Sequence, residues 1–88
     1  MMWRLDLSKN AEKFLDKNRL TLEEVRELAG KALRYFRGED INIDIKKLKG
    51  VWTGFYRIRS GRLSIIVTFD FEETSVLVEE IDWRGNAY

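Results

Sequence analysis

Apolar positions recur at strand spacing from Val51 to Asp70, and Ser60-Gly61 interrupts them. Aromatic and β-branched residues are frequent in this stretch, and it contains no proline. Such residues favour strands, and glycine readily adopts the positive φ angle that a tight turn between two strands needs. The pattern therefore predicts a β-hairpin with its turn at Ser60-Gly61.

Strand alternation divides the side chains of this hairpin between two faces. The predicted apolar face holds Trp52, Tyr56, Ile58, Leu63, Ile65, Val67 and Phe69. The opposite face holds Phe55, Arg57, Arg59, Arg62, Ser64, Ile66 and Thr68. Burial of several unpaired guanidinium groups would cost many kcal/mol, so we expect the polar members of this second face to point outward. These members, expected on one concave surface, are Arg57, Arg59, Arg62 and Ser64.

A short strand and two helices are predicted before the hairpin. Residues 2–7 alternate between apolar and polar types, which predicts the strand, and Ser8 is suited to cap a short helix after it. Thr21 begins a capping-box pattern, and apolar residues then recur at intervals of three and four up to Phe36. This predicts an amphipathic helix that Gly38 terminates.

The segment 39–50 has two interpretations. Ile41, Ile43 and Ile45 alternate with polar residues, which is consistent with a strand or with an extended crossover that fills the edge of the core. We favour the crossover.

Residues 75–83 predict a final strand, which follows a second turn. Apolar residues occur at both parities along it, so we expect a central strand or one covered on both faces. Simple alternation makes Val78 and Ile81 face opposite ways and gives Arg84 the parity of Val78. The predicted order is β-α-α-β-β-β, an α+β two-layer domain of residues 1–88 with a helical hairpin packed on an antiparallel sheet.

The composition of the 88-residue chain is that of an ordered globular protein, with 44% hydrophobic and 35% charged residues. It contains no cysteine and no histidine, which removes the usual zinc ligands and the usual acid–base group at neutral pH. We therefore expect no metal and no small-molecule cofactor. Because no apolar run approaches the roughly 20 residues that span a bilayer, we also expect no membrane association and a cytoplasmic protein.

The net charge is only +1, but the charges are segregated along the chain. Between Ile45 and Phe69 there are six cations and no acid, whereas residues 70–82 hold six acids and no cation. The six cations are Lys46, Lys47, Lys49, Arg57, Arg59 and Arg62. A basic surface beside aromatic residues, such as Phe55 and Tyr88, suits phosphates and stacked bases. It is also consistent with a solvated sheet face or with an acidic protein partner.

Four segments, in order along nearly the whole chain, resemble motifs of the RelE/ParE superfamily of toxins. They are residues 3–15 (WRLDLSKNAEKFL), Leu48-Lys49-Gly50, residues 54–61 (GFYRIRSG) and residues 81–88 (IDWRGNAY). The resemblance implies that family's two-layer fold and a toxin of a type II toxin–antitoxin pair, with a cognate antitoxin as partner. RelE-like members cleave mRNA in the ribosomal A site, whereas ParE-like members poison DNA gyrase.

In RelE-like members, residues at four positions of these motifs act on the mRNA. The matching residues, which the resemblance makes the catalytic candidates, are Arg57, Arg59, Arg84 and Tyr88. A further family arginine, after the hairpin turn, aligns with Ser64, and Arg62 on the same predicted face is the candidate to replace it. The expected contacts to RNA phosphates or ribosomal RNA are Lys46, Lys47, Lys49, Arg62 and Ser64.

RNA cleavage without a metal needs a base for the ribose 2′-OH, cations for the developing phosphorane and an acid for the leaving oxygen. Guanidinium groups suit the charge-stabilising part because they bind phosphate in a bidentate way. Arginine is a poor base, because its pKa lies far above neutral pH, so Tyr88 is the candidate general base. Alternatively, the Tyr88 ring stacks on a nucleobase. With no histidine or free carboxylate expected on this face, cleavage should be slow unless the ribosome positions the mRNA.

Three functions therefore fit the sequence. The favoured one is a ribosome-dependent mRNA endoribonuclease, which acts on the ribosome and mRNA. The first alternative is a ParE-like inhibitor of DNA gyrase, which the serine at position 64 favours. The second is a degenerate, non-catalytic module that binds an antitoxin or RNA. Either toxin would bind its antitoxin on the apolar or the basic surface.

Overall fold

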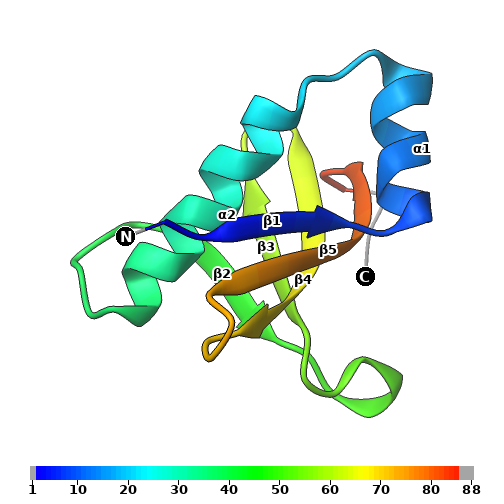
Figure 1. The fold of residues 1–88 in the computed structure, drawn as a ribbon. Helices are drawn as coiled ribbons and strands as arrows, with labels where there is room; N and C mark the ends of the chain where they lie inside the picture. The colour runs from blue at the N-terminus through cyan, green and yellow to red at the C-terminus, as the bar shows by residue number, and fades with distance from the viewer. Residues whose placement is uncertain (1, 86–88) are drawn as a thin grey trace.

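The computed structural model describes residues 2–85 of the chain. Its elements are β1 (Arg4–Leu7), α1 (Lys9–Asn18), α2 (Leu22–Phe36), β2 (Asp44–Lys47), the 3-10 turn η1 (Gly50–Trp52), β3 (Tyr56–Ser60), β4 (Leu63–Asp70) and β5 (Ser75–Trp83). The five strands form one sheet in the order β1-β5-β4-β3-β2, in which β1 is parallel to β5 and the other neighbours are antiparallel. Figure 1 shows α1 beside the ends of β1 and β5. Within the described range, neither helix is long and apolar enough to cross a bilayer.

Both helices cover the same face of the sheet, and one apolar core lies between the two layers. The core residues are Ala11, Leu15, Val25, Leu28, Ala29, Ala32, Ile58, Leu63, Ile65, Val67, Val76, Val78 and Ile81. Full burial of a large apolar side chain stabilises a fold by about 1.5–3 kcal/mol, so this face determines which side of each strand points inward. The predicted α+β two-layer architecture is confirmed, and β5 is a central strand as expected.

The predicted hairpin is formed by β3 and β4. Ser60 pairs with Leu63, so the two turn residues are Gly61 and Arg62, one position later than predicted. Gly61 has a φ of 56°, which glycine adopts at little cost.

The first strand of the hairpin is shorter than predicted, because residues 50–52 form η1 instead. Val51 is 95% exposed, and Trp52 belongs to this turn rather than to the apolar strand face. Phe55 closes the loop by accepting a backbone hydrogen bond from Leu48 at 3.0 Å. Figure 1 shows η1 standing away from the body of the domain, beyond the ends of β2 and β3.

The crossover expected in segment 39–50 is wrong for its central part. Residues 44–47 form β2, which pairs antiparallel with β3 and adds a strand to the predicted order. Ile45 lies opposite Ile58 and packs against the core. The backbone of β2 pairs with that of β3, and β2 thereby becomes the edge strand of the sheet.

The two helix starts differ in how they are capped. The Ser8 hydroxyl accepts a hydrogen bond from the Ala11 N–H at 3.1 Å, as its N-cap position predicts. Thr21 occupies the N-cap of α2 but makes no side-chain capping bond, so the predicted capping box is wrong in this detail. Gly38, with a φ of 93°, follows the end of α2 as expected.

A β-bulge interrupts the pairing of β4 with β5. Val67 pairs with Val78 and Ile66 pairs with Glu80, so Glu79 is an extra residue in β5. A bulge of this kind shifts the alternation of the strand by one position.

The bulge changes which residues of β5 face the core. Val78 before it and Ile81 after it are both buried in the core, so the prediction that they face opposite ways is wrong. Glu80, Asp82 and the following Arg84 have the other parity after the bulge. The prediction that Arg84 shares the face of Val78 is therefore also wrong.

Candidate functional site

The face of the sheet opposite the helices, which we call the open face, carries two rows of side chains fixed by the strand register. Directly paired residues of neighbouring strands point to the same face. One row across β2, β3, β4 and β5 consists of Asp44, Arg59, Ser64 and Asp82. The next row consists of Lys46, Arg57, Ile66 and Glu80. Two of the predicted catalytic arginines therefore lie on one face, as the alternation predicts.

Three arginines converge on the carboxylate of Asp44. The Nε of Arg59 donates a hydrogen bond to Asp44 Oδ2 at 2.9 Å. One terminal guanidinium nitrogen of Arg57 lies 3.9 Å from Oδ1, and one of Arg84 lies 3.8 Å from Oδ2. β2, β3 and the end of β5 thus place three positive charges around one negative charge, which we call the arginine–aspartate cluster.

The bulge in β5 and one backbone bond together place Arg84 in this cluster. After the bulge, residues with the parity of Asp82 face away from the core. The Arg84 N–H then donates to the carbonyl of Arg62 at 2.8 Å, which extends the β4–β5 pairing just past the strand. Without the extra residue, Arg84 would have the parity of the core residues.

Arg57 is less exposed than the sequence led us to expect. Its side chain is only 10% exposed, whereas those of Arg59 and Arg84 are 34% and 47% exposed. The expectation that it points freely outward is therefore wrong, and the Asp44 carboxylate, 3.9 Å away, partly offsets the cost of burying its charge. An arginine buried to this extent is packed into the site and is not a surface charge that only aids solubility.

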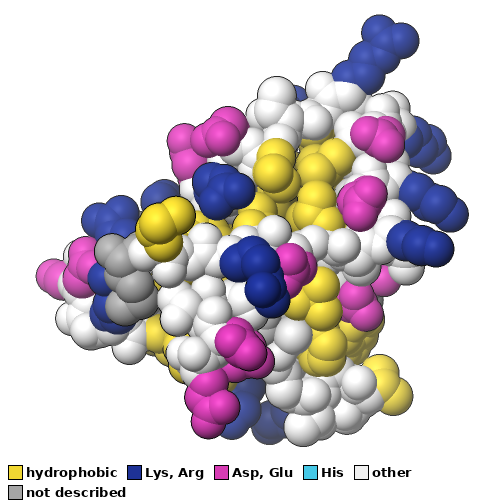
Figure 2. All heavy atoms as spheres, viewed as in Figure 1, with side chains coloured by type: hydrophobic (Ala, Val, Ile, Leu, Met, Phe, Trp, Pro, Cys, Tyr) yellow, Lys and Arg dark blue, Asp and Glu magenta, His cyan; other side chains and the backbone are white. Residues whose placement is uncertain are grey.

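The open face also carries acidic side chains, which corrects the expectation of a face without carboxylates. Asp44 comes from β2, and Glu80 and Asp82 come from β5. Antiparallel pairing brings the acidic segment 70–82 against the basic hairpin, so separation along the chain does not become separation in space. Figure 2 shows acidic and basic side chains interspersed over the side of the molecule seen in Figure 1.

Arg62 does not belong to the open face, so the expectation that it lies beside Arg57 and Arg59 is wrong. Its position in the turn directs it to α2, where it donates two hydrogen bonds to Glu24, at 3.1 and 3.2 Å. These bonds and the charge of Glu24 raise the pKa of Arg62. Its guanidinium also lies 5.6 Å from the ring centre of Trp83. Arg62 therefore does not replace the family arginine at the position of Ser64.

Ser64 is buried between its row neighbours and is 2% exposed. Its hydroxyl has no hydrogen-bond partner within residues 2–85. The fourth catalytic candidate, Tyr88, lies outside the described residues.

The predicted basic contacts occupy different places. Lys46 is exposed on the open face beside Arg57. Lys47 pairs with Tyr56, which packs against the core, so Lys47 has the opposite orientation at the sheet edge. Lys49 is exposed in the loop before η1. Of these three lysines, only Lys46 is therefore shown to lie on the face that carries the arginine–aspartate cluster.

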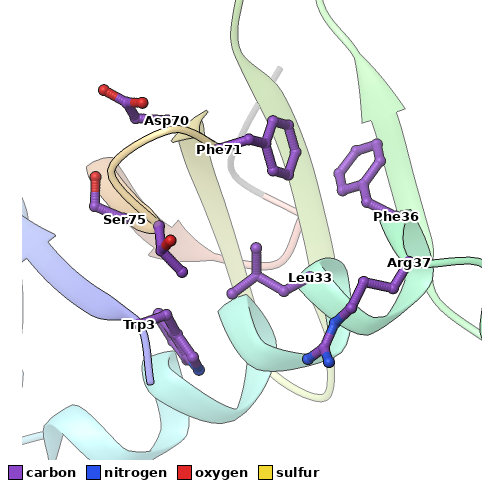
Figure 3. Close-up of a pocket in the computed structure, with 8 residues that line it drawn as sticks. Trp3, Leu33, Phe36, Arg37, Asp70, Phe71 and Ser75 are labelled. Atoms are coloured by element: carbon purple, nitrogen blue, oxygen red, sulfur yellow. The ribbon is translucent and has the colours of Figure 1, made fainter. Parts of the chain in front are cut away.

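Two pockets flank the elements that build this site. A polar pocket of about 290 Å³ adjoins the arginine–aspartate cluster and is lined by Lys31, Asn42, Ile43, Asp44, Arg59, Ser60, Gly61 and Arg84. An apolar pocket of about 200 Å³ lies between β1, the end of α2 and the β4–β5 turn. Figure 3 shows Trp3, Leu33, Phe36 and Phe71 around the apolar pocket, with Arg37 at its side.

Aromatic rings gather beside the apolar pocket. The ring of Phe36 lies 5.1 Å from that of Phe69 and 5.9 Å from that of Phe71, and these last two are stacked. Phe36 is 36% exposed and Phe71 is 63% exposed. The protein thus presents large apolar side chains to solvent at this edge.

The sequence did not identify Asp44 or Lys31 as site residues. The alternation of Ile43 and Ile45 carried the signal for Asp44, because a strand there places the residue between them on the face of Arg57 and Arg59. Lys31 lies on α2, and nothing in its local sequence marks it. Within residues 2–85 there is no group of three or more acidic, cysteine or histidine residues placed to hold a metal ion.

No family model matches the sequence, and no curated protein sequence matches it either. Solved structures of toxins match the fold over nearly their whole length. A chain of the archaeal RelE–RelB complex from Pyrococcus horikoshii OT3 is 25% identical with a TM-score of 0.62, and the match covers 99% of this chain and 100% of that one.

Two bacterial structures match at lower sequence identity and with slightly higher TM-scores. A chain of the YoeB–YefM complex from Staphylococcus aureus is 20% identical with a TM-score of 0.65, covering 96% of this chain and 99% of that one. The metal-bound toxin from Helicobacter pylori is 16% identical with a TM-score of 0.66, covering 99% and 100%. The protein therefore has the fold of the RelE-like toxins, which confirms the predicted resemblance.

Proposed function

We propose that the protein is the toxin of a type II toxin–antitoxin pair and acts as a ribosome-dependent mRNA endoribonuclease. The observation that supports this most strongly is the arginine–aspartate cluster. Two guanidinium groups of β3 and one that directly follows β5 converge within 3.9 Å of one carboxylate on the open face of a RelE-like fold. Solved structures with this fold include toxin–antitoxin complexes from Mycobacterium tuberculosis and Staphylococcus aureus.

The cluster has the chemistry that phosphodiester cleavage requires. The ribose 2′-OH gives its proton to a base and its oxygen attacks the neighbouring phosphorus, so that negative charge develops on the phosphorane oxygens. The bond to the 5′-oxygen then breaks, and that oxygen takes a proton from water. Arg57, Arg59 and Arg84 are assigned to bind and stabilise that charge, because fixed cations act most strongly on charge that develops in the transition state. Tyr88 is retained from the sequence as the proposed base.

Asp44 is assigned a positioning role in this mechanism. Its hydrogen bond holds the guanidinium of Arg59, and its charge attracts those of Arg57 and Arg84. Three like charges held close together would otherwise repel one another. The carboxylate thus keeps the arginines gathered before the RNA phosphate arrives.

Induced expression in bacterial cells tests the function. We expect growth arrest and mRNA cut within codons, and the double substitution Arg84→Ala/Tyr88→Ala should abolish both. Arg4→Ala is the matched control, because Arg4 is an exposed arginine of β1 paired only with Asp6 in the described structure. Toxicity that persists in the double variant would rule out the proposed site.

Gyrase inhibition is the second candidate function, and one observation favours it. The position of the family arginine holds the buried Ser64, and Arg62 points to α2 instead of replacing it. The same induction experiment separates the two functions, because a gyrase inhibitor would produce DNA damage while leaving mRNA intact.

We propose further that the apolar pocket receives a segment of the cognate antitoxin. The exposed rings of Phe36 and Phe71 offer apolar area that a monomer leaves in water, and Arg37 beside them suits an acidic residue of the partner. This surface is separate from the arginine–aspartate cluster, so an antitoxin anchored there would leave the cluster chemically unchanged.

A further inference from the structure

The polar pocket beside the arginine–aspartate cluster contains a lysine that the proposed cleavage mechanism does not use. Lys31 comes from α2 and lines the pocket together with Arg59 and Arg84. Its side chain is exposed and forms no ion pair or hydrogen bond within residues 2–85. Glu27, one turn earlier on α2, lines a neighbouring hollow with it, but no ion pair joins them.

The charge of the pocket favours an anion. Lys31, Arg59 and Arg84 contribute three positive charges, and Asp44 contributes one negative charge, so the lining has a net charge of +2. Asp44 is already hydrogen-bonded to Arg59, whereas Lys31 stands free to receive a ligand. Asn42, which is exposed at the same pocket, adds an amide that can donate and accept hydrogen bonds.

The size of the pocket limits what it can take. Its volume of about 290 Å³ is at the lower end of the roughly 300–1,000 Å³ typical of small-molecule sites. A phosphate with its attached sugar suits that space better than a whole cofactor. Arg59 and Arg84 belong both to this pocket and to the arginine–aspartate cluster. A phosphate in the pocket would therefore be adjacent to a phosphate bound by the cluster.

We propose that this pocket is a second anion subsite, in which Lys31 binds the phosphate next to the one held by Arg57, Arg59 and Arg84. The protein then binds two consecutive phosphates of a single RNA strand. The inference rests on the proposed function in one respect, which is that the ligand is RNA. Lys31 binds and orients the strand and takes no part in bond cleavage.

Two short RNAs that cannot be cleaved test the subsite. A 2′-O-methyl dinucleotide without terminal phosphates has one phosphodiester, and the corresponding trinucleotide has two. Lys31→Gln should weaken binding of the trinucleotide by about tenfold or more, the loss expected for one charge-assisted contact, and leave the dinucleotide unchanged. In a plot of the logarithm of the trinucleotide binding constant against the logarithm of the salt concentration, the variant should have a slope that is less steep by about 0.7.

The control is Lys13→Gln, which removes the same charge from the exposed side of α1. It should affect both RNAs equally and only slightly. A Lys31→Gln variant that behaves like Lys13→Gln, or that weakens both RNAs to the same extent, would overturn the subsite. Because the probes are not cleaved, this result is independent of whether the protein is a nuclease. Conversely, cleavage by the wild type with no Lys31 effect would reject the subsite alone.

Discussion

Asp44 has two opposite effects on an incoming phosphate. Its carboxylate attracts three arginines and accepts a hydrogen bond from Arg59 at 2.9 Å. The same carboxylate places a negative charge where the phosphate must approach. Two unit charges 4 Å apart interact by about 1 kcal/mol in water and about 4 kcal/mol at an effective dielectric constant of 20. The repulsion is therefore large enough to measure, and binding and cleavage should respond differently to its removal.

Substitution of Asp44 by Asn tests this balance. Asp44→Asn keeps the size of the side chain but removes the charge, so we expect binding of a non-cleavable RNA to become about five- to tenfold tighter. Cleavage on the ribosome at saturating protein should become slower, because the three guanidinium groups are no longer held together. Binding is measured by titration and cleavage by single-turnover kinetics. Weaker binding with an unchanged cleavage rate would contradict the role assigned to Asp44.

At the scale of elements, the open face depends on how β5 is attached to its neighbours. Ser8, between β1 and α1, accepts a hydrogen bond from Ala11 and donates one to the carbonyl of Glu79 at 2.6 Å. Glu79 is the extra residue of the bulge. The Ser8 hydroxyl therefore both caps α1 and provides a hydrogen-bond donor for the backbone carbonyl of the bulge residue. Because the bulge sets the parity of Arg84, this contact links the start of α1 to the site.

Ser8→Ala should destabilise the protein by about 1–3 kcal/mol, since it removes a helix cap and leaves a part-buried carbonyl without its partner. Thr21→Ala is the matched control at the other helix, where no side-chain capping bond exists, and it should cost only a few tenths of a kcal/mol. Urea unfolding of both variants measures the difference. Equal losses of stability would show that the Ser8 contacts contribute little.

The alternation of apolar residues predicted most of the element boundaries but could not predict the bulge. Strict period two gives Val78 and Ile81 opposite faces, and only the pairing with β4 reveals the extra Glu79 between them. β2 was missed for a related reason, since a strand of four residues at a sheet edge has little local signal beyond three spaced isoleucines. Both misses affected the site, because the bulge orients Arg84 and β2 supplies Asp44.

Charges were harder to place than apolar residues. Arg57 and Arg59 could be assigned to one face because burial of their apolar neighbours fixes the register. Arg62 could not, because a turn residue does not follow strand alternation, and its partner Glu24 lies on another element. The position of Lys31 likewise depends on how α2 crosses the sheet, which is a property of tertiary packing.

At the scale of the whole molecule, the two proposed binding surfaces are separate. The arginine–aspartate cluster lies on the open face, whereas the apolar pocket lies between β1, α2 and the β4–β5 turn (Figure 3). A partner can therefore hold the protein by its exposed aromatic rings without contacting the arginines. Such a partner then inhibits RNA cleavage in one of two ways. Either a further segment of it covers the open face, or the complex is too large to enter the ribosomal A site.

Phe71→Ser should weaken binding of the proposed cognate antitoxin by about tenfold or more, because Phe71 is the most exposed ring at the apolar pocket. Val51→Ser is the control, since Val51 is a more exposed apolar residue on η1, away from that pocket. Calorimetry with the purified pair measures both. If the two substitutions have the same effect, the antitoxin does not anchor at the apolar pocket.

The most direct test of the central claim is cleavage of mRNA on programmed ribosomes by the purified protein. The account predicts that the wild type cuts the mRNA in the A site, and that Arg59→Ala/Arg84→Ala slows cutting by at least about 100-fold. The Arg4→Ala control should cut at the wild-type rate. Intact mRNA in the presence of the folded wild-type protein, or equal cutting by the double variant, would contradict the claim that the arginine–aspartate cluster is an RNA-cleaving site.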